Sequence, residues 1–218
     1  MKNLPLFSTD ITIKIIIAMK RKIIYQFNIE LHHIEPSIWR RIEVPYDYTF
    51  WDLHVAIQDA MGWDDSHLHR FEIKLENSRV PSFIGIPMDE DFNHMPEFVI
   101  RAGWEVPLSE VFDLPGVAVQ YEYDFGDSWQ HTILLESIHL AKSRVRYPKC
   151  IDGQRACPPE DCGGIWGYHN ILEVLADRKH PEYADVREWV GRFDPERFDA
   201  KKVKFDNPHE RRLLAFRE

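Results

Sequence analysis

The thiol groups of this chain are concentrated in one short segment, KCIDGQRACPPEDCGGIWGYHN, at residues 149–170. Its cysteines are spaced C-x6-C-x4-C, and only the second interval falls in the range usual for zinc knuckles. Thiolates are soft ligands that suit zinc in a protein whose cysteines are reduced. The segment is therefore a candidate structural zinc site, with the ligands Cys150, Cys157, Cys162 and His169, or with His131 or Asp161 in place of His169.

The same segment can be interpreted without a metal. Pro158-Pro159 and Gly163-Gly164 are typical of a stiff turn that leads into a helix near Trp166, with the cysteines packed as small apolar residues. In that case we expect at least one of the two glycines to adopt a positive φ. A catalytic thiol or a regulatory disulfide is a third interpretation, but the sequence lacks the C-x-x-C spacing of dithiol oxidoreductases.

Histidines form a second constellation. The segments DSHLHRFEI (65–73) and DSWQHTILL (127–135) both place Asp-Ser before an expected strand and a histidine four residues after the aspartate. On a strand, two histidines spaced as His67 and His69 share one face, a geometry that can hold a metal ion. One interpretation is a metal-dependent hydrolase built around His67, His69, Asp127 and His131. The other is that these histidines, with Asp124 and Asp127, are turn and cap residues.

The acidic pair of the cysteine segment is expected to contact this second region. We predict that the CPPEDC loop packs against the start of the SWQHTILL strand, where Glu160 or Asp161 accepts hydrogen bonds from donors such as His131. Such bonds would lower the pKa of the carboxyl group. This contact defines a candidate recognition surface made of Asp124, Asp127, His131, Glu160 and Asp161.

The first strands and the first helix, which must position these groups, follow from periodicity. Residues 25–31 and 38–44 alternate apolar and polar side chains, as half-buried strands do, and HLHRFEIKLE indicates a third strand. Before that third strand, Thr49 and Asp52 form the pattern of a helix capping box, and Gly62 provides a C-terminal stop.

The remaining elements indicate the fold class. Residues 76–107 are rich in proline and predict an irregular excursion with at most one short strand, at 98–100. Alternation on both sides of the turn residues 124–127 predicts a β-hairpin. Helical periodicity follows at 171–175 and 186–190. Strands first and helices late predict an α+β fold: a mostly antiparallel sheet, one helix after the second strand and a helical C-terminal third.

Charge and hydropathy restrict the partners. The net charge of −9, from 36 acidic and 27 basic residues, disfavours nucleic acid, so a protein partner is the stronger expectation. The basic clusters at 40–41, 144–149 and 201–204 are interpreted as solvated surface. The apolar run at 11–17 is too short to span a membrane. We therefore expect a cytoplasmic protein.

The domain organisation is expected to be simple. Residues 1–20 are interpreted as a leader that is disordered, or as an over-extended start with Met19 as the initiator. Residues 21–218 are interpreted as a single domain.

Five sequence blocks carry a resemblance to a known family. IEPSIWRRIEVP, GWDDSHLHRFEI, YEYDFGDSWQHTILLE, RACPPEDCGGIWGY and WVGRFDPERFD resemble, in order, the signature blocks of the plasmid pRiA4b ORF-three-like family, over about residues 23–205. The resemblance implies an α+β domain with a roll-like sheet, found in bacteria and archaea and often near mobile elements. It implies no established activity. Some members carry a resolvase label, but this acidic chain lacks the clustered arginines and basic helix pair of a serine recombinase.

Two function hypotheses follow. The first is a non-catalytic binding or accessory module, whose recognition surface is the hairpin turn with the CPPEDC loop and whose only expected cofactor is zinc. The alternative is the metal-dependent hydrolase described above. The resemblance also places valine at the Cys162 position in some family members, which argues against a site that needs all three thiolates.

Overall fold

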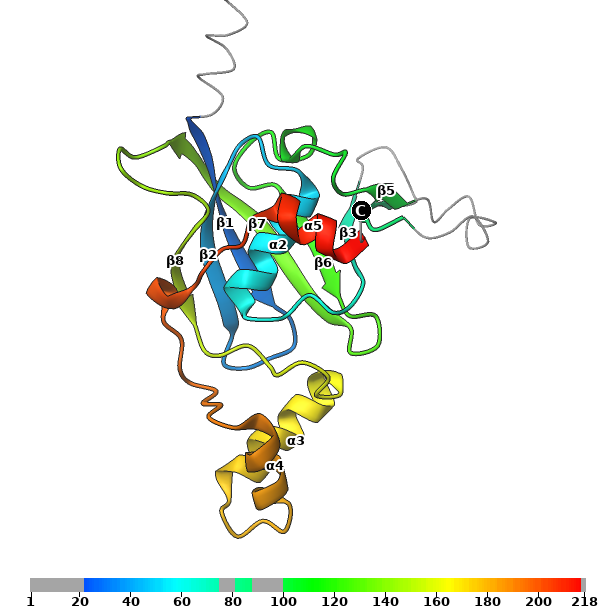
Figure 1. The fold of residues 1–218 in the computed structure, drawn as a ribbon, viewed down its shortest axis with the longest axis vertical. Coiled ribbons are helices and arrows are strands. Elements are labelled where there is room, and N and C mark those ends of the chain that lie inside the picture. Colours follow the sequence, from blue (N-terminus) through cyan, green and yellow to red (C-terminus); the bar gives the residue numbers. More distant parts are fainter. Residues whose placement is uncertain (1–21, 75–80, 88–99, 217–218) are drawn as a thin grey trace, which may run out of the picture.

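The computed structural model describes residues 22–74, 81–87 and 100–216. Its strands form one eight-stranded sheet in the order β5-β4-β3-β6-β7-β1-β2-β8, with every pair antiparallel except β4 and β5 (Figure 1). The strands are β1 (Ile23–Leu31), β2 (Ile38–Pro45), β3 (His69–Ile73), β4 (Ser82–Gly85), β5 (Ile100–Ala102), β6 (Ala118–Tyr123), β7 (Trp129–Leu140) and β8 (Lys149–Gln154). The helices lie outside this sheet. The predicted α+β class is confirmed.

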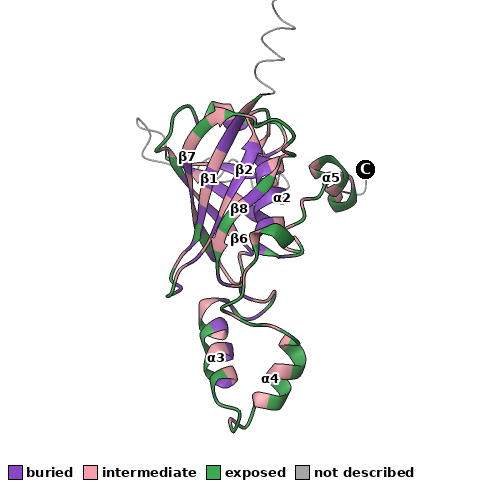
Figure 2. Ribbon diagram, turned by 90° about the vertical axis from the view of Figure 1, so that its left-hand side faces the viewer, coloured by how far each residue is buried: buried purple, intermediate pink, exposed green. Residues whose placement is uncertain are grey.

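Helix α2 (Phe50–Met61) packs against the inner face of the sheet and provides most of the helical part of the core. Thr49 and Asp52 form the predicted capping box, and Gly62 ends the helix with a φ of 99°. Phe27 and Ile29 of β1, fully buried, face this helix as the strand alternation predicted. Figure 2 shows the buried residues gathered on α2 and on the strands beside it.

The predicted hairpin is formed by β6 and β7. Its last aligned residues are Tyr123 and Trp129, so the five residues between them make the turn. Asp124 and Ser128 in this turn have positive φ values of 55° and 54°. The start of β7 also pairs with the end of β1, which places the hairpin turn at one end of the sheet.

Helices occupy the C-terminal third, as expected. Helices α3 (Gly164–Ala176) and α4 (Tyr183–Val190) extend beyond one end of the sheet (Figures 1 and 2), and α4 has no buried residue. Helix α5 (Pro208–Phe216) returns to α2, where the indole of Trp51 donates to the carbonyl of Pro208 at 2.9 Å. Short 3-10 turns lie at Leu108–Glu110 and Ala200–Lys202. Among the described residues, no helix is long and apolar enough to cross a membrane.

Several expectations need correction or lie outside the described residues. Strand β4 falls in the segment that was expected to be almost entirely irregular, and β8 was not expected at all. Arg40, interpreted as solvated, is buried on β2. The proposed leader is outside the described residues, and so is most of the short strand expected at 98–100, where β5 begins at Ile100.

Candidate metal centre

Three side chains from separate segments meet at the end of the sheet near the hairpin turn. The Nε2 atom of His67 lies 3.1 Å from Oδ1 of Asp161 and 3.7 Å from Oδ2 of Asp124. The donor atoms of the three residues all lie within 4.8 Å of one another. We call this group the His67 cluster. Its side chains differ in exposure: 11% for Asp124, 29% for His67 and 74% for Asp161.

The hairpin turn fixes Asp124. Its backbone N–H donates to the carbonyl of Leu68 at 2.9 Å, and its own carbonyl accepts from Ser128 at 2.6 Å. Its Oδ1 atom accepts from the N–H of Gly126 at 2.9 Å, as in an Asx turn. Because Oδ1 is held in the turn, Oδ2 is the oxygen that faces His67.

The CPPEDC loop brings in Asp161, and this loop is anchored on both sides. The indole N–H of Trp63 donates to the carbonyl of Pro158 at 3.0 Å. On the other side, the N–H of Gly163 donates to Oδ2 of Asp127 in the hairpin turn at 3.1 Å. Asp161 itself has a φ of 53°, a left-handed conformation that aspartate tolerates better than most residues. The end of the loop is therefore tied to the hairpin turn at Asp127, next to the strand start where the contact was predicted.

His67 precedes β3 and is not part of the strand. Its ring lies edge-on to Tyr123, with the centroids 5.8 Å apart. Its Nε2 atom is buried and makes no hydrogen bond, although two carboxylates face it. Donor atoms bound to one ion at about 2.1 Å are separated by about 3.0 Å at a right angle and about 3.6 Å at 120°. The separations of 3.1 and 3.7 Å are close to this range.

A second group of potential ligands, His54, Asp65 and His69, lies inside the core. His54 uses both ring nitrogens: Nδ1 is 2.8 Å from the hydroxyl of Tyr121, and Nε2 is 2.6 Å from Oδ1 of Asp65. The rings of His54 and His69 are stacked, 3.4 Å apart and 9° from parallel. An ion between them would lie far out of both ring planes, whereas imidazole lone pairs lie in the plane. This group therefore fits a structural hydrogen-bond relay better than a metal site.

The sequence had placed His67 and His69 on one strand face, but the structure separates them. His67 belongs to the surface cluster, and His69 is 1% exposed in the core. The reason is that β3 begins only at His69, so the residues before it do not follow strand alternation. His54 on α2 was not singled out from the sequence, and its position on the buried face of a capped helix was the available signal.

His131 has a different environment from the one expected. It is fully buried between Trp63 and Tyr121, and neither of its ring nitrogens has a hydrogen-bond partner. The prediction that it donates to Glu160 or Asp161 is wrong, because alternation on β7 points this side chain into the core. Burial lowers the pKa of His131 to about 3.

Glu160 also departs from expectation. One of its oxygens accepts from the N–H of Asp64 and from the hydroxyl of Tyr123, both at 2.9 Å. Its pKa is nevertheless raised, because desolvation outweighs these two hydrogen bonds. The expected lowering of this pKa is therefore wrong for Glu160. The expectation was based on hydrogen-bond donors and did not include the burial of the carboxyl group.

The cysteines are divided between a strand and the loop. Cys150 lies on β8, whereas Cys157 and Cys162 lie in the loop. All are free thiols. Burial raises the pKa of Cys150 to about 11, that of Cys162 to about 12 and that of Cys157 well above its usual value. Neither group of clustered ligand atoms in the described residues includes a cysteine or His169. The described part of the chain therefore brings no three of the predicted zinc ligands together.

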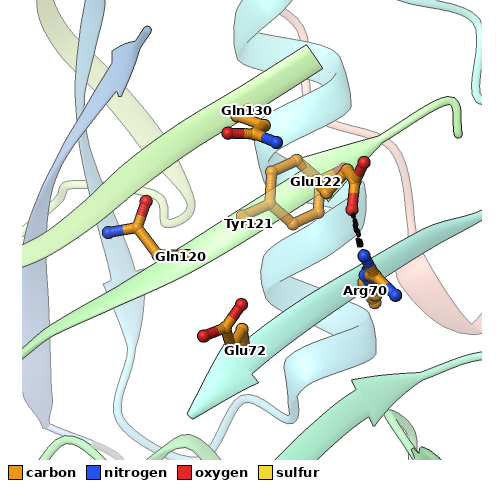
Figure 3. A pocket seen from close by; sticks show the side chains of 6 residues that line it. All are labelled: Arg70, Glu72, Gln120, Tyr121, Glu122 and Gln130. Atoms are coloured by element: carbon orange, nitrogen blue, oxygen red, sulfur yellow. Dashed lines mark hydrogen bonds and ion pairs between the residues drawn. The ribbon is translucent and has the colours of Figure 1, made fainter. Parts of the chain in front are cut away.

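A shallow pocket of about 110 Å³ lies elsewhere, on the outer face of the sheet (Figure 3). Arg70 and Glu122 line it and pair with each other across β3 and β6 at 2.7 Å. Glu122 also accepts from the hydroxyl of Ser128 at 2.8 Å. Because Arg70 and Ser128 are both bonded to Glu122, the pocket resembles an ordinary solvent-exposed face of a sheet.

Comparison with known proteins identifies the family of this chain. The sequence profile of the plasmid pRiA4b ORF-3-like proteins matches residues 23–202. The chain belongs to this family. It is 36% identical over 182 residues to the uncharacterized protein y4hQ of Sinorhizobium fredii, covering 84% of this chain and 87% of that protein. Its fold is similar to the crystal structure of MM3350, a protein of unknown function from Methanosarcina mazei, with a TM-score of 0.75, 43% identity and coverage of 84% and 99%.

Proposed function

We propose that this family member is a metal-dependent binding module in which His67, Asp124 and Asp161 hold a divalent transition-metal ion. The observation that carries the proposal is the buried Nε2 atom of His67, which has no hydrogen-bond partner and faces carboxylates from two other segments. One imidazole with two carboxylates is a donor set that suits Zn²⁺ or Mn²⁺.

Binding is favoured over catalysis by what surrounds the cluster. Asp161 is largely exposed, so further coordination positions would face solvent, where an oxygen from a partner protein could reach them. The hydrolase hypothesis required His69 and His131 beside His67. Both are buried in the core, at 1% and 0% exposure, and cannot reach a substrate at the surface.

A bound metal ion would also link three segments of the chain that otherwise meet only through separate pairwise contacts. His67 precedes β3, Asp124 belongs to the hairpin turn and Asp161 belongs to the CPPEDC loop. An ion that binds only this folded arrangement stabilises the native state by mass action. The surface formed by the turn and the loop would then be ordered by the ion, which supports a role in recognition.

The test is calorimetric titration of the purified, metal-free protein with Zn²⁺ and with Mn²⁺. We expect one saturable site per chain and a rise in melting temperature with metal. His67→Ala and Asp161→Asn should each weaken binding roughly tenfold or more, because each removes one of three ligands.

Matched controls are His209→Ala and Asp185→Asn, which change exposed residues on α5 and α4. Both should leave the affinity unchanged. Affinity that survives the changes at His67 and Asp161 would refute the proposal. Affinity lost instead on changing Cys157 and Cys162 to serine would assign the metal to the cysteine loop.

A further inference from the structure

A second surface feature is lined in part by residues of the CPPEDC loop. It is a cleft of about 510 Å³ between the end of α2, residues 156–160 and the C-terminal segment 190–203. Much of its lining is apolar, including Met61, Pro158, Phe193 and Val203. A cleft of this size and lining can hold a small organic molecule.

The most unusual residue in its lining is Arg40, which is 1% exposed. Three of its five N–H groups are used. The Nε donates to the carbonyl of Ala60 at 2.8 Å, and Nη1 donates to the carbonyls of Trp39 and Gln154 at 2.8 and 2.9 Å. The ring of Phe198 covers the guanidinium, 3.7 Å from its central carbon.

The remaining nitrogen of Arg40, Nη2, has no hydrogen-bond partner among the described residues, and Arg40 forms no ion pair with any of them. Carbonyl oxygens hold the other two nitrogens, so Nη2 is the group left to face the cleft. The thiols of Cys157 and Cys150 act on the pKa of Arg40, and burial raises the pKa values of both thiols, so that both are neutral at pH 7. A buried arginine without a carboxylate partner is costly unless an anion compensates it.

The acids that line the cleft are already engaged. Asp59 pairs with Arg211 at 2.8 Å and accepts from the N–H of Asp206 at 2.8 Å. Asp199 accepts from the N–H of Lys201 at 3.1 Å, which caps a short turn. These carboxylates are therefore held by partners other than Arg40.

Two further cations of the cleft, Arg197 and Lys202, are exposed and form no ion pair with the described part of the chain. Glu160, the third acid of the lining, has one oxygen held by Asp64 and Tyr123. Three cations without ion-pair partners among the described residues thus line the cleft, while Asp59 and Asp199 are held by other groups and Oε2 of Glu160 has no hydrogen-bond partner.

We propose that this cleft binds a small organic anion, with its carboxylate or phosphate group against Nη2 of Arg40, Arg197 and Lys202 and its apolar body against Phe193 and Val203. The site is independent of the metal, because it shares no residue with the His67 cluster. Carboxylate and phosphate offer similar acceptor oxygens to a guanidinium, so the experiment below distinguishes the two head groups.

The test is ligand-observed NMR, followed by titration calorimetry, with the wild-type protein. The probes are phenyl phosphate, phenylacetate, inorganic phosphate and benzyl alcohol. We expect saturable binding of at least one of the two aromatic anions, whichever head group fits. Inorganic phosphate should bind at least tenfold more weakly, because it lacks the apolar body, and benzyl alcohol should not compete.

Variants at the exposed cations keep the test independent of folding. Changing both Arg197 and Lys202 to alanine should weaken the aromatic anion at least fivefold. The matched control changes Arg178 and Lys179, exposed in the α3–α4 connection, to alanine and removes the same charge. The proposal is overturned by equal loss in both double variants, by equal affinity for benzyl alcohol or inorganic phosphate, or by no saturable binding of either aromatic anion.

Discussion

His131 shows how burial changes what a residue can do. Its spacing from Asp127 indicated chemistry, but the ring is fully buried between Trp63 and Tyr121. The same holds for His69, whose pKa burial holds well below the usual value. The sequence grouped Asp124 and Asp161 in one candidate surface but assigned His67 to a different candidate site. Residue types and spacing did not indicate that these three meet, because that depends on how three distant segments dock.

The buried His131 makes stability dependent on pH. Desolvation lowers its pKa from 6.5 to about 3, so the unfolded chain takes up a proton first as the pH falls. The contribution of this group is therefore complete above pH 6.5 and is lost as the pH falls toward 3. At pH 5 the loss from this one residue is about 2 kcal/mol.

His131→Phe keeps a ring in the core and removes the titration. We expect the free energy of unfolding of the variant, relative to wild type, to rise by about 2 kcal/mol between pH 7.5 and pH 5, measured by urea denaturation at each pH. His209→Phe, at an exposed site, is the control and should show no such change. A parallel pH dependence for wild type and His131→Phe would contradict a buried, neutral His131.

For individual helices and strands, sequence signals between neighbouring residues predicted the structure reliably. The capping box of α2 and the β6–β7 hairpin depend on residues close in sequence, and both are confirmed. Strand β4 was missed because it is only four residues long. Strand β8 was missed because it pairs at the sheet edge with β2, which is distant in sequence. β8 also carries an irregular register against Arg41 and Ile42, which weakens its alternation.

The start of α3 shows why the double glycine is there. Gly163 and Gly164 have φ values of 85° and 66°, which confirms the predicted positive φ. A Cβ atom on Gly164 would lie 2.7 Å from the carbonyl oxygen of Asp127, whereas one on Gly163 would meet nothing closer than 3.7 Å. The glycines therefore allow the helix to begin in contact with the hairpin turn.

Alanine at each glycine separates backbone strain from close contact. Gly163→Ala should destabilise the protein by about 1 kcal/mol, the cost of a side chain at positive φ. Gly164→Ala should cost roughly 2 to 3 kcal/mol, because the contact with Asp127 is added to the strain. Gly116→Ala, at a φ of 99° with open space around it, is the strain-only control. Equal costs for Gly163→Ala and Gly164→Ala in urea denaturation would refute the contact.

At the scale of the molecule, the sheet gathers its polar groups at one end. The segment before β3 and the β6–β7 turn meet there because β3, β6 and β7 are neighbours in the sheet. The loop after β8 reaches this end through its contacts with Trp63 and Asp127. The loop then separates the His67 cluster from the anion cleft: Asp161 belongs to the first, and Pro158 to Glu160 line the second. A chain with a net charge of −9 thus has an acidic cluster at His67 and, beside it, a cleft whose lining includes Arg40, Arg197 and Lys202.

The most direct test of the metal-binding account locates the ion. Crystals of the protein grown with Zn²⁺ would be measured at the zinc absorption edge. We predict an anomalous-difference peak about 2.1 Å from Nε2 of His67, Oδ2 of Asp124 and Oδ1 of Asp161. A peak at the cysteine sulfurs or between His54 and His69, or no peak at the His67 cluster, would contradict the account.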